Sequence, residues 1–465
     1  MVFSTSIFLF FFLPIVIIGY YLLKENLRIA FLLLASLFFY AWGEPKYILV
    51  MLLSIVINYS FGILINKYIN NRLFSKILLI TAIALNLGIL FYFKYFNFTL
   101  NTINIFFNTS FVFRNIVLPI GISFFLFQGM SYLIDLYWKK VEVQKDPLKV
   151  AFYIAFFPQL MAGPIIRYSD IREQINNRKE TLELFTCGAQ RFVIGLSKKV
   201  LIADNLAVVA DLVFANPAIE NTFATAWIGV LSFTFQLYFD FSGYSDMAIG
   251  LAKMFGFKFN ENFNYPYISK TMSEFWRRWH ISLSSWFRDY VYIPLGGSRK
   301  GNAYANIFFV FFLTGLWHGA NFNCVLWGIW NGIILIIERL FKIQDVKNKY
   351  FIPIRYVITM LIFIIGLAIF RSPGLFYARD LLGIMFGFLK PENVGYLTSY
   401  YLSPKLVILL CIAAVASTPI AKMPFKFYST ALWKNIKPVL SIILMFISIV
   451  FVAASSFTPF IYFRF

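Results

Sequence analysis

The chain of 465 residues is 60% hydrophobic and 13% charged, and its many apolar runs of about 20 residues exclude a soluble globular protein. Its net charge of +20 would suggest nucleic acid in a soluble protein. In a membrane protein, basic cytoplasmic loops and anionic headgroups account for most of it, so membrane lipid is the expected partner and nucleic acid is not. The three scattered cysteines lack metal-ligand spacing, which predicts buried thiols, no disulfide framework and no metal site.

The composition predicts an all-α polytopic membrane protein that forms one domain over residues 1–465. Residues 1–23 have no basic n-region and no small-residue cleavage site, so they predict a retained first helix. We expect about 11 true spans, because hydropathy overcounts segments that carry Pro, Gly or charge, and some of these would be re-entrant or buried. The candidate spans lie near 3–23, 27–42, 47–65, 77–96, 116–138, 150–166, 190–214, 224–239, 240–257, 303–320, 322–340, 352–370, 405–421 and 438–457.

The charges of the loops predict the orientation in the membrane. Loop 66–76 carries three basic residues, whereas loop 97–115 carries only Arg114. By the positive-inside rule the first loop is cytoplasmic and the second is external, which places the N-terminus outside. Four lysines precede the last span, so the C-terminal tail 458–465 is also predicted to be extracytoplasmic.

Two carboxylates, Asp240 and Asp246, lie where the candidate spans 224–239 and 240–257 meet. A buried carboxylate without a partner is costly. We therefore expect each to pair with an arginine or with Asn or Ser donors, and we favour this structural role over catalysis.

Both histidines of the chain lie between Phe275 and Gly319. Residues from about 275 to 291 predict one amphipathic, basic helix at the membrane interface, which is too polar to span. At 3.6 residues per turn His280 falls among aromatic side chains, where its neutral, proton-accepting form is favoured. The other side carries arginines that predict binding either to the phosphates of a cytoplasmic donor or to lipid headgroups; they include Arg277, Arg278 and Arg288.

His318 follows the apolar run 307–317, so it is predicted at membrane depth, where an ionisable residue is costly and indicates function. Gly315 and Gly319 would let a ligand approach the backbone. No serine elbow, phosphate-binding loop or pair of metal ligands accompanies this histidine. A lone basic histidine predicts proton abstraction from a hydroxyl; the alternative is a neutral histidine bonded to a backbone carbonyl.

These motifs resemble those of the membrane-bound O-acyltransferases, in the bacterial branch that contains the membrane subunits of alginate and peptidoglycan O-acetylation. The resemblance covers most of residues 118–330 and implies a ring of helices around a thin centre. It implies that His318 is the catalytic histidine and His280 the second functional one. The stretches that carry it read LPIGISFF from Leu118, FFPQLMAGPI from Phe156, FDFSGYSD from Phe239, FWRRWHISLSSWFRDYVYIPLGGSR from Phe275 and GLWHGAN from Gly315.

The C-terminal tail, TPFIYFRF at 458–465, is similar to a short aromatic motif of this branch in which a tyrosine is implicated as an acyl relay. The similarity implies that role for Tyr462. Arg464 stands where the motif has Gln or Asn. The alternative is that Tyr462 belongs to an interfacial aromatic belt.

The resemblance implies an activity in the bacterial cytoplasmic membrane. An acetyl group would pass from a cytoplasmic thioester, with acetyl-CoA as donor substrate and no bound cofactor, to an extracytoplasmic O-acetyltransferase with a serine nucleophile. Peptidoglycan is the favoured acceptor, because the short final loop and aromatic tail resemble peptidoglycan-type members. The alternatives are alginate or another exopolysaccharide, D-alanylation of teichoic acid, and a proton-coupled transporter or flippase that uses His318 and Asp240 as a relay.

Overall fold

The computed structural model describes residues 1–161, 163–345, 349–420 and 431–454 together with Phe460, and the regular elements of this part of the chain are all helical. The predicted all-α fold is therefore confirmed. Contacts divide the chain into a first unit, Met1–Phe192 with Tyr244–Asn260, and a second unit, Val193–Gly243 with Glu261–Phe465. Whether the chain acts as the single domain that the sequence predicts stays a prediction.

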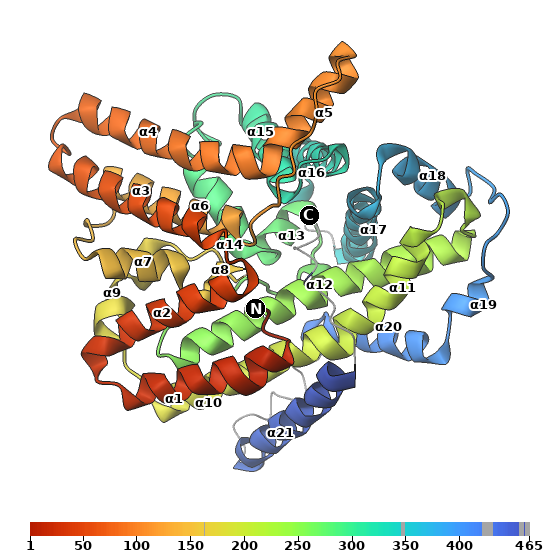
Figure 1. The fold of residues 1–465 in the computed structure, drawn as a ribbon. Coiled ribbons are helices and arrows are strands. Elements are labelled where there is room, and N and C mark those ends of the chain that lie inside the picture. Colours follow the sequence, from red (N-terminus) through yellow and green to blue (C-terminus); the bar gives the residue numbers. More distant parts are fainter. Residues whose placement is uncertain (162, 346–348, 421–430, 455–459, 461–465) are drawn as a thin grey trace. The chain divides into compact units, whose positions relative to one another are not determined.

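The first unit is built around α3, which packs against α4 and α6, while α2 packs against α7 (Figure 1). Helices α4 and α5 are joined by a π-helical turn and run on as one helix, Arg72–Phe107. The elements are η1 (Phe8–Phe12), α1 (Leu13–Leu22), α2 (Glu25–Gly43), α3 (Ile48–Lys67), α4 (Arg72–Leu90), η2 (Phe91–Tyr95), α5 (Phe96–Phe107), α6 (Ile122–Tyr137), α7 (Pro147–Ala155), α8 (Phe157–Leu160), α9 (Tyr168–Asn177) and most of α10 (Leu182–Ser197).

The second unit holds both histidine motifs, and in it α16 packs along α15, α13 and α17. Helix α12 (Phe223–Met254) supplies a segment to each unit. The other elements are η3 (Lys198–Ala203), α11 (Asp204–Ala215), η4 (Ala218–Glu220), η5 (Pro266–Ile268), α13 (Met272–Arg278), α14 (Ile281–Phe287), η6 (Arg288–Tyr292), α15 (Ala303–His318), α16 (Phe322–Leu340), η7 (Ile343–Asp345), η8 (Lys349–Phe351), α17 (Ile352–Arg371), α18 (Leu375–Met385), α19 (Thr398–Tyr401), α20 (Pro404–Ala416) and α21 (Ala431–Ala454).

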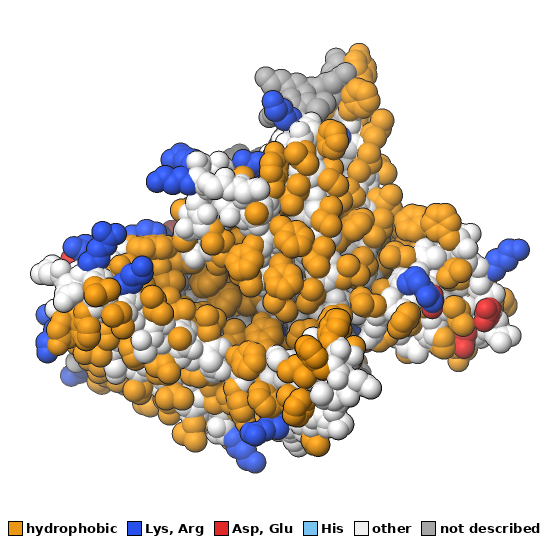
Figure 2. Space-filling view, turned by 90° about the horizontal axis from the view of Figure 1, so that it is seen from above, with side chains coloured by type: hydrophobic (Ala, Val, Ile, Leu, Met, Phe, Trp, Pro, Cys, Tyr) orange, Lys and Arg blue, Asp and Glu red, His pale blue; other side chains and the backbone are white. Residues whose placement is uncertain are grey.

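Among the described residues, six helices are long and apolar enough to cross a membrane. They are Glu25–Gly43, Ile48–Lys67, Arg72–Phe107, Phe322–Leu340, Ile352–Arg371 and Ile436–Ala454, and three shorter apolar helices are Phe8–Leu22, Ala303–His318 and Pro404–Ala416. Hydrophobic side chains spread over the surface seen in Figure 2, as expected for a protein that faces lipid. The chain is a multi-pass membrane protein; the figure of about 11 spans stays a prediction.

Helix α12 corrects the prediction of two spans that meet at Asp240, because residues 223–254 form one helix of 32 residues. No break is needed, because ion pairs neutralise both carboxylates within the helix. Asp240 Oδ1 lies 3.0 Å from Lys199 Nζ, and Asp246 Oδ1 lies 2.8 Å from the guanidinium of Arg191. The expected ion pairing is thus confirmed, with a lysine as one of the two partners.

The prediction of buried cysteines is correct for one residue of three. Cys324 is buried, whereas Cys187 and Cys411 are exposed free thiols. Cys411 lies on the apolar helix α20, where a side chain can face lipid without being buried in protein.

Candidate functional site

The helix predicted over about 275–291 is wrong in one respect, because the chain breaks at His280. Helix α13 ends at Arg278, His280 adopts a left-handed conformation (φ 43°), and α14 begins at Ile281. Backbone groups on both sides of this break form hydrogen bonds with residues 262–264. The N–H of Ile281 donates to the backbone carbonyl of Asn262 (2.9 Å). These nonlocal hydrogen bonds satisfy backbone groups that a continuous helix would have satisfied itself.

The fully buried His280 lies edge-on to Phe241, with ring centroids 4.6 Å apart. Its Nδ1 lies 3.2 Å from Oδ1 of Asn262, which also accepts the backbone N–H of Ser282 (3.1 Å). That atom is therefore an acceptor, so Nδ1 of His280 carries the proton and Nε2 carries the lone pair. Burial, and then the charge of nearby His318, lower the pKa of His280 well below its usual range. His280 is thus a neutral imidazole whose basic nitrogen is Nε2.

His318 is the last residue of α15 and is buried among aromatic rings. The ring centroids of Trp327, Trp317 and Phe370 lie 4.8, 4.9 and 5.7 Å from the imidazole centroid, each at a steep angle. These residues come from α16, α15 and α17, so three helices fix the position of one side chain. A neutral imidazole can accept a proton from a hydroxyl.

Glycines position His318 by allowing α15 and α16 to touch. A Cβ on Gly315 would lie 2.5 Å from the backbone oxygen of Cys324, and one on Gly328 would come at least as close to that of Phe311. The expectation that Gly315 and Gly319 leave space for a ligand is therefore wrong, because α16 fills that space. The contact instead brings Trp327 against His318.

The two histidines, 38 residues apart in sequence, share an aromatic neighbour. Trp317 is adjacent to His318, and its ring centroid lies 5.9 Å from that of His280. Phe241 of α12 also packs against His280. The structure thus gathers both predicted histidines at one place, while their catalytic roles stay predictions.

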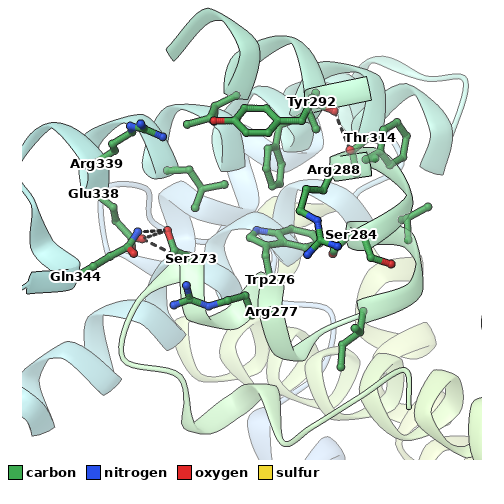
Figure 3. Close-up of a pocket in the computed structure, with 18 of the residues that line it drawn as sticks. Ser273, Trp276, Arg277, Ser284, Arg288, Tyr292, Thr314, Glu338, Arg339 and Gln344 are labelled. Carbon is green, nitrogen blue, oxygen red and sulfur yellow. Dashed lines mark hydrogen bonds between the residues drawn. The ribbon is translucent and has the colours of Figure 1, made fainter. Parts of the chain in front are cut away.

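A cavity of about 720 Å³ opens beside this site, between α13, α14, η6, α15 and α16 (Figure 3). Arg277 and Arg288, both expected to bind the donor, line it. Arg278 does not; it donates to Glu274 (3.0 Å) and to the carbonyl of Asn264 (3.0 Å). Arg339 and Lys342, which were not expected from the sequence, also line the cavity. In the sequence, the feature that could have identified them is their position at the basic end of an apolar helix.

Glu338 is a further residue of the site that was not expected from the sequence. It is buried on α16 and accepts hydrogen bonds from the backbone N–H of Met272 and of Ser273 (3.0 Å) and from the Ser273 hydroxyl (2.9 Å). The carboxylate thereby caps the positive end of α13. It ties α13, and with it the cavity residues Trp276 and Arg277, to α16. An acidic residue inside an apolar helix was the available signal.

The inner wall of the cavity leads toward His318. Trp276 and Thr314 line the cavity, and Thr314 lies one turn before His318 on α15. The Trp276 ring lies 5.7 Å from that of Trp327, which lies 4.8 Å from His318. Two indoles therefore separate a cationic cavity from the histidine.

Tyr462 lies outside the described residues. Phe460, two positions before it, is completely buried in the second unit, with its ring 5.9 Å from Phe241. Because Phe241 also touches His280, Phe460 lies next to the histidine site.

Comparison with known proteins agrees with this geometry. Residues 141–372 match the model of the membrane-bound O-acyltransferase family. The chain is 41% identical over 491 residues to the probable alginate O-acetylase AlgI of Pseudomonas putida, with all of both chains covered. It is 34% identical over 519 residues to a peptidoglycan O-acetyltransferase of Helicobacter pylori, covering 100% of this chain and 98% of that protein. A teichoic acid D-alanyltransferase of Bacillus subtilis is 30% identical over 250 residues, 51% of this chain and 63% of that protein. The chain, with its paired histidine motifs, belongs to the membrane-bound O-acyltransferase family.

Proposed function

We propose that this enzyme transfers an acetyl group from a cytoplasmic thioester to a hydroxyl on the outer side of the membrane. The observation that carries the proposal is the cavity that is lined by cationic side chains and by Trp276, whose ring packs through Trp327 toward His318. Membership of an acyltransferase family favours this enzyme over the transporter or flippase.

Acetyl-CoA is the proposed donor. The cavity volume of about 720 Å³ is within the ordinary range for small-molecule sites. Phosphates would pair with Arg277, Arg288, Arg339 and Lys342, since guanidinium and ammonium groups bind phosphate strongly. The apolar wall would hold the pantetheine arm. A carrier protein presenting the same arm is the alternative donor.

In the proposed reaction, Nε2 or Nδ1 of His318 removes the proton from the acceptor hydroxyl as its oxygen attacks the thioester carbonyl. The carbon–sulfur bond then breaks, and the thiolate leaves and takes up that proton. His280, held neutral by burial, lines the same site and would orient the acceptor through Nε2.

Tyr462 is the proposed first acceptor. The burial of Phe460 against Phe241 supports a tail that docks at the histidine site. A phenyl ester formed there would remain reactive, because a phenol of reference pKa about 10 leaves more readily than an alcohol. An extracytoplasmic transferase with a serine nucleophile would take the acetyl group and pass it to a polysaccharide.

The relatives differ in the polysaccharide that their names give as the acceptor. Peptidoglycan follows from the tail and final loop, and the Helicobacter pylori enzyme supports it. The higher identity and full coverage of the alginate O-acetylase support an exopolysaccharide, and we place this acceptor first. Deleting the gene and measuring ester-bound acetate in secreted polysaccharide and in peptidoglycan separates the two, because only the true acceptor loses acetate.

The direct test incubates purified protein with radiolabelled acetyl-CoA and measures retained label and intact mass. Wild type should carry one acetyl group. His318→Ala should lower the rate of labelling by about 10²–10⁴-fold, as expected for loss of a general base. Tyr462→Phe should abolish the label, whereas Tyr400→Phe, which alters an exposed tyrosine elsewhere in the chain, should retain it.

Other outcomes redirect the proposal. Label that survives Tyr462→Phe would place the first acceptor elsewhere and reduce the tail to a docking element. Labelling of His318→Ala at the wild-type rate would remove this histidine from the reaction. Absence of both label and CoA binding in wild type would make a carrier protein the donor.

A further inference from the structure

Two tryptophans beside the histidine site have indole N–H groups that bond to nothing in the described part of the chain. Trp276 and Trp327 are 7% and 4% exposed, and Nε1 of each lacks a hydrogen-bond acceptor among the described residues. Trp330 and Trp227, by contrast, donate to the carbonyls of Ile362 (3.1 Å) and Met385 (2.8 Å). A buried donor without a partner is costly, so each such group in a native structure calls for an explanation.

The placement of these two donors points to a ligand. Trp276 lines the cationic cavity, and Trp327 lies against His318. Their rings are 5.7 Å apart and inclined at 72°. Both indoles therefore lie between the donor cavity and the proposed base.

We propose that the indole N–H groups of Trp276 and Trp327 bind the thioester carbonyl oxygen and stabilise the oxyanion of the tetrahedral intermediate. This rests on the acyl transfer proposed above. As the hydroxyl oxygen bonds to the carbonyl carbon, its proton passes to His318 and the carbonyl π electrons move to oxygen. When the carbonyl re-forms, the carbon–sulfur bond breaks and the thiolate leaves with the proton. The indoles donate hydrogen bonds throughout and lose no proton.

Indoles suit this role because they are rigid, neutral donors in an apolar setting, where a hydrogen bond to developing charge is strong. Three other donors near the site are engaged elsewhere. The Nδ1–H of His280 faces Asn262, and the N–H of Gly319 donates to the carbonyl of Gly315 (3.3 Å). The N–H of Cys324 donates to the Asn321 side chain (2.8 Å).

The test replaces each indole by a ring without an N–H. Trp276→Phe and Trp327→Phe should each lower kcat for acetyl transfer by about 10²–10³-fold, the usual effect of losing one oxyanion donor, with KM for acetyl-CoA little changed. Trp330→Phe is the matched control on α16, because its indole bonds to a backbone carbonyl instead. It should lower the thermal midpoint and leave kcat close to wild type.

A second measurement tests whether the indoles donate hydrogen bonds to the carbonyl oxygen. The probe is an unreactive ketone analogue of acetyl-CoA in which a methylene replaces the sulfur, and its carbonyl stretching frequency is measured by infrared spectroscopy. Binding to wild type should lower this frequency, and the shift should shrink in Trp276→Phe and Trp327→Phe but not in Trp330→Phe.

Two results would overturn the inference while acetyl transfer itself stands. One is an unshifted carbonyl in the wild-type complex. The other is a kcat loss in Trp276→Phe and Trp327→Phe no larger than in Trp330→Phe. If wild type neither binds the analogue nor transfers acetyl, the proposed function fails first, and this inference fails with it.

Discussion

His280 shows how a single residue can depend on contacts far away in sequence. A non-glycine residue with positive φ is uncommon, and here it is His280 that takes this conformation, at the junction of α13 and α14. Asn262, 18 residues earlier, holds the junction through both its backbone and its side chain. The same contact fixes the imidazole tautomer, so backbone geometry and chemistry have one cause.

The lowered pKa of His280 predicts a pH-dependent stability. The unfolded imidazole has a pKa of about 6.5, whereas the folded one is protonated only at much lower pH. Below about pH 6.5 the unfolded state therefore binds more protons, and stability should fall by up to about 1.4 kcal/mol per pH unit. Thermal midpoints in detergent at pH 7 and pH 5 measure this. His280→Asn, which tolerates positive φ, should lose less on acidification; an equal loss would contradict the assignment.

The two ion pairs of Lys199 predict which of two variants loses more stability. Its Nζ lies 2.5 Å from Asp204 and 3.0 Å from Asp240, and its side chain is 4% exposed. Lys199→Met removes the cation from two carboxylates and should cost about 3–5 kcal/mol, as for a broken buried pair. Asp240→Asn leaves Lys199 with Asp204 and should cost less. Denaturant or thermal unfolding compares the two, and the reverse order would refute this account.

At the scale of elements, the contact between α15 and α16 sets the position of the site. The glycines Gly315 and Gly328 let the two backbones touch, and a short turn then returns the chain beside His318. Asn321 begins α16 by accepting the N–H of Cys324 (2.8 Å). Close helix packing through small residues is the usual solution in membranes, where apolar burial alone does not drive helices together.

Gly315→Ala should disrupt this contact. The added Cβ would lie 2.5 Å from the Cys324 carbonyl oxygen, which is backbone and cannot rotate away. We expect a loss of about 1–3 kcal/mol or more from overpacking, together with reduced acetyl transfer as His318 shifts. Gly88→Ala on α4 is the control, because a Cβ added there would have nothing within 4 Å, and it should be neutral or stabilising by up to about 1 kcal/mol. Similar midpoints for the two variants would disprove the packing argument.

At the scale of the whole molecule, the membrane determines where charge can lie. Helices α4 and α5 run on as one helix, Arg72–Phe107, which is long enough to cross a hydrocarbon core of about 30 Å. The basic residues of the loop before it and the nearly uncharged segment after α5 then belong on opposite sides. The positive-inside rule assigns the basic side to the cytoplasm.

Cysteine labelling in spheroplasts tests this orientation. In a Cys187→Ser/Cys411→Ser background, which removes the exposed native thiols, a membrane-impermeant maleimide should label Thr109→Cys without permeabilisation. It should label Asn70→Cys only after permeabilisation. Both positions are exposed in the structure, so labelling in the opposite pattern would invert the proposed topology.

The sequence by itself determined the helical class, the family and most helix positions. The predicted spans 27–42 and 322–340, for example, fall within α2 and α16, because apolar length is a local property that hydropathy reads directly. It also identified the two histidines, since charge and titratable groups are rare in such a chain. Tertiary structure alone decided the break at His280, the continuity of α12, and the cavity that gathers Arg277 with Arg339 and leaves out Arg278. Each of these depends on partners distant in the chain, such as Asn262, Lys199 and Glu338, and periodicity along one segment carries no information about them.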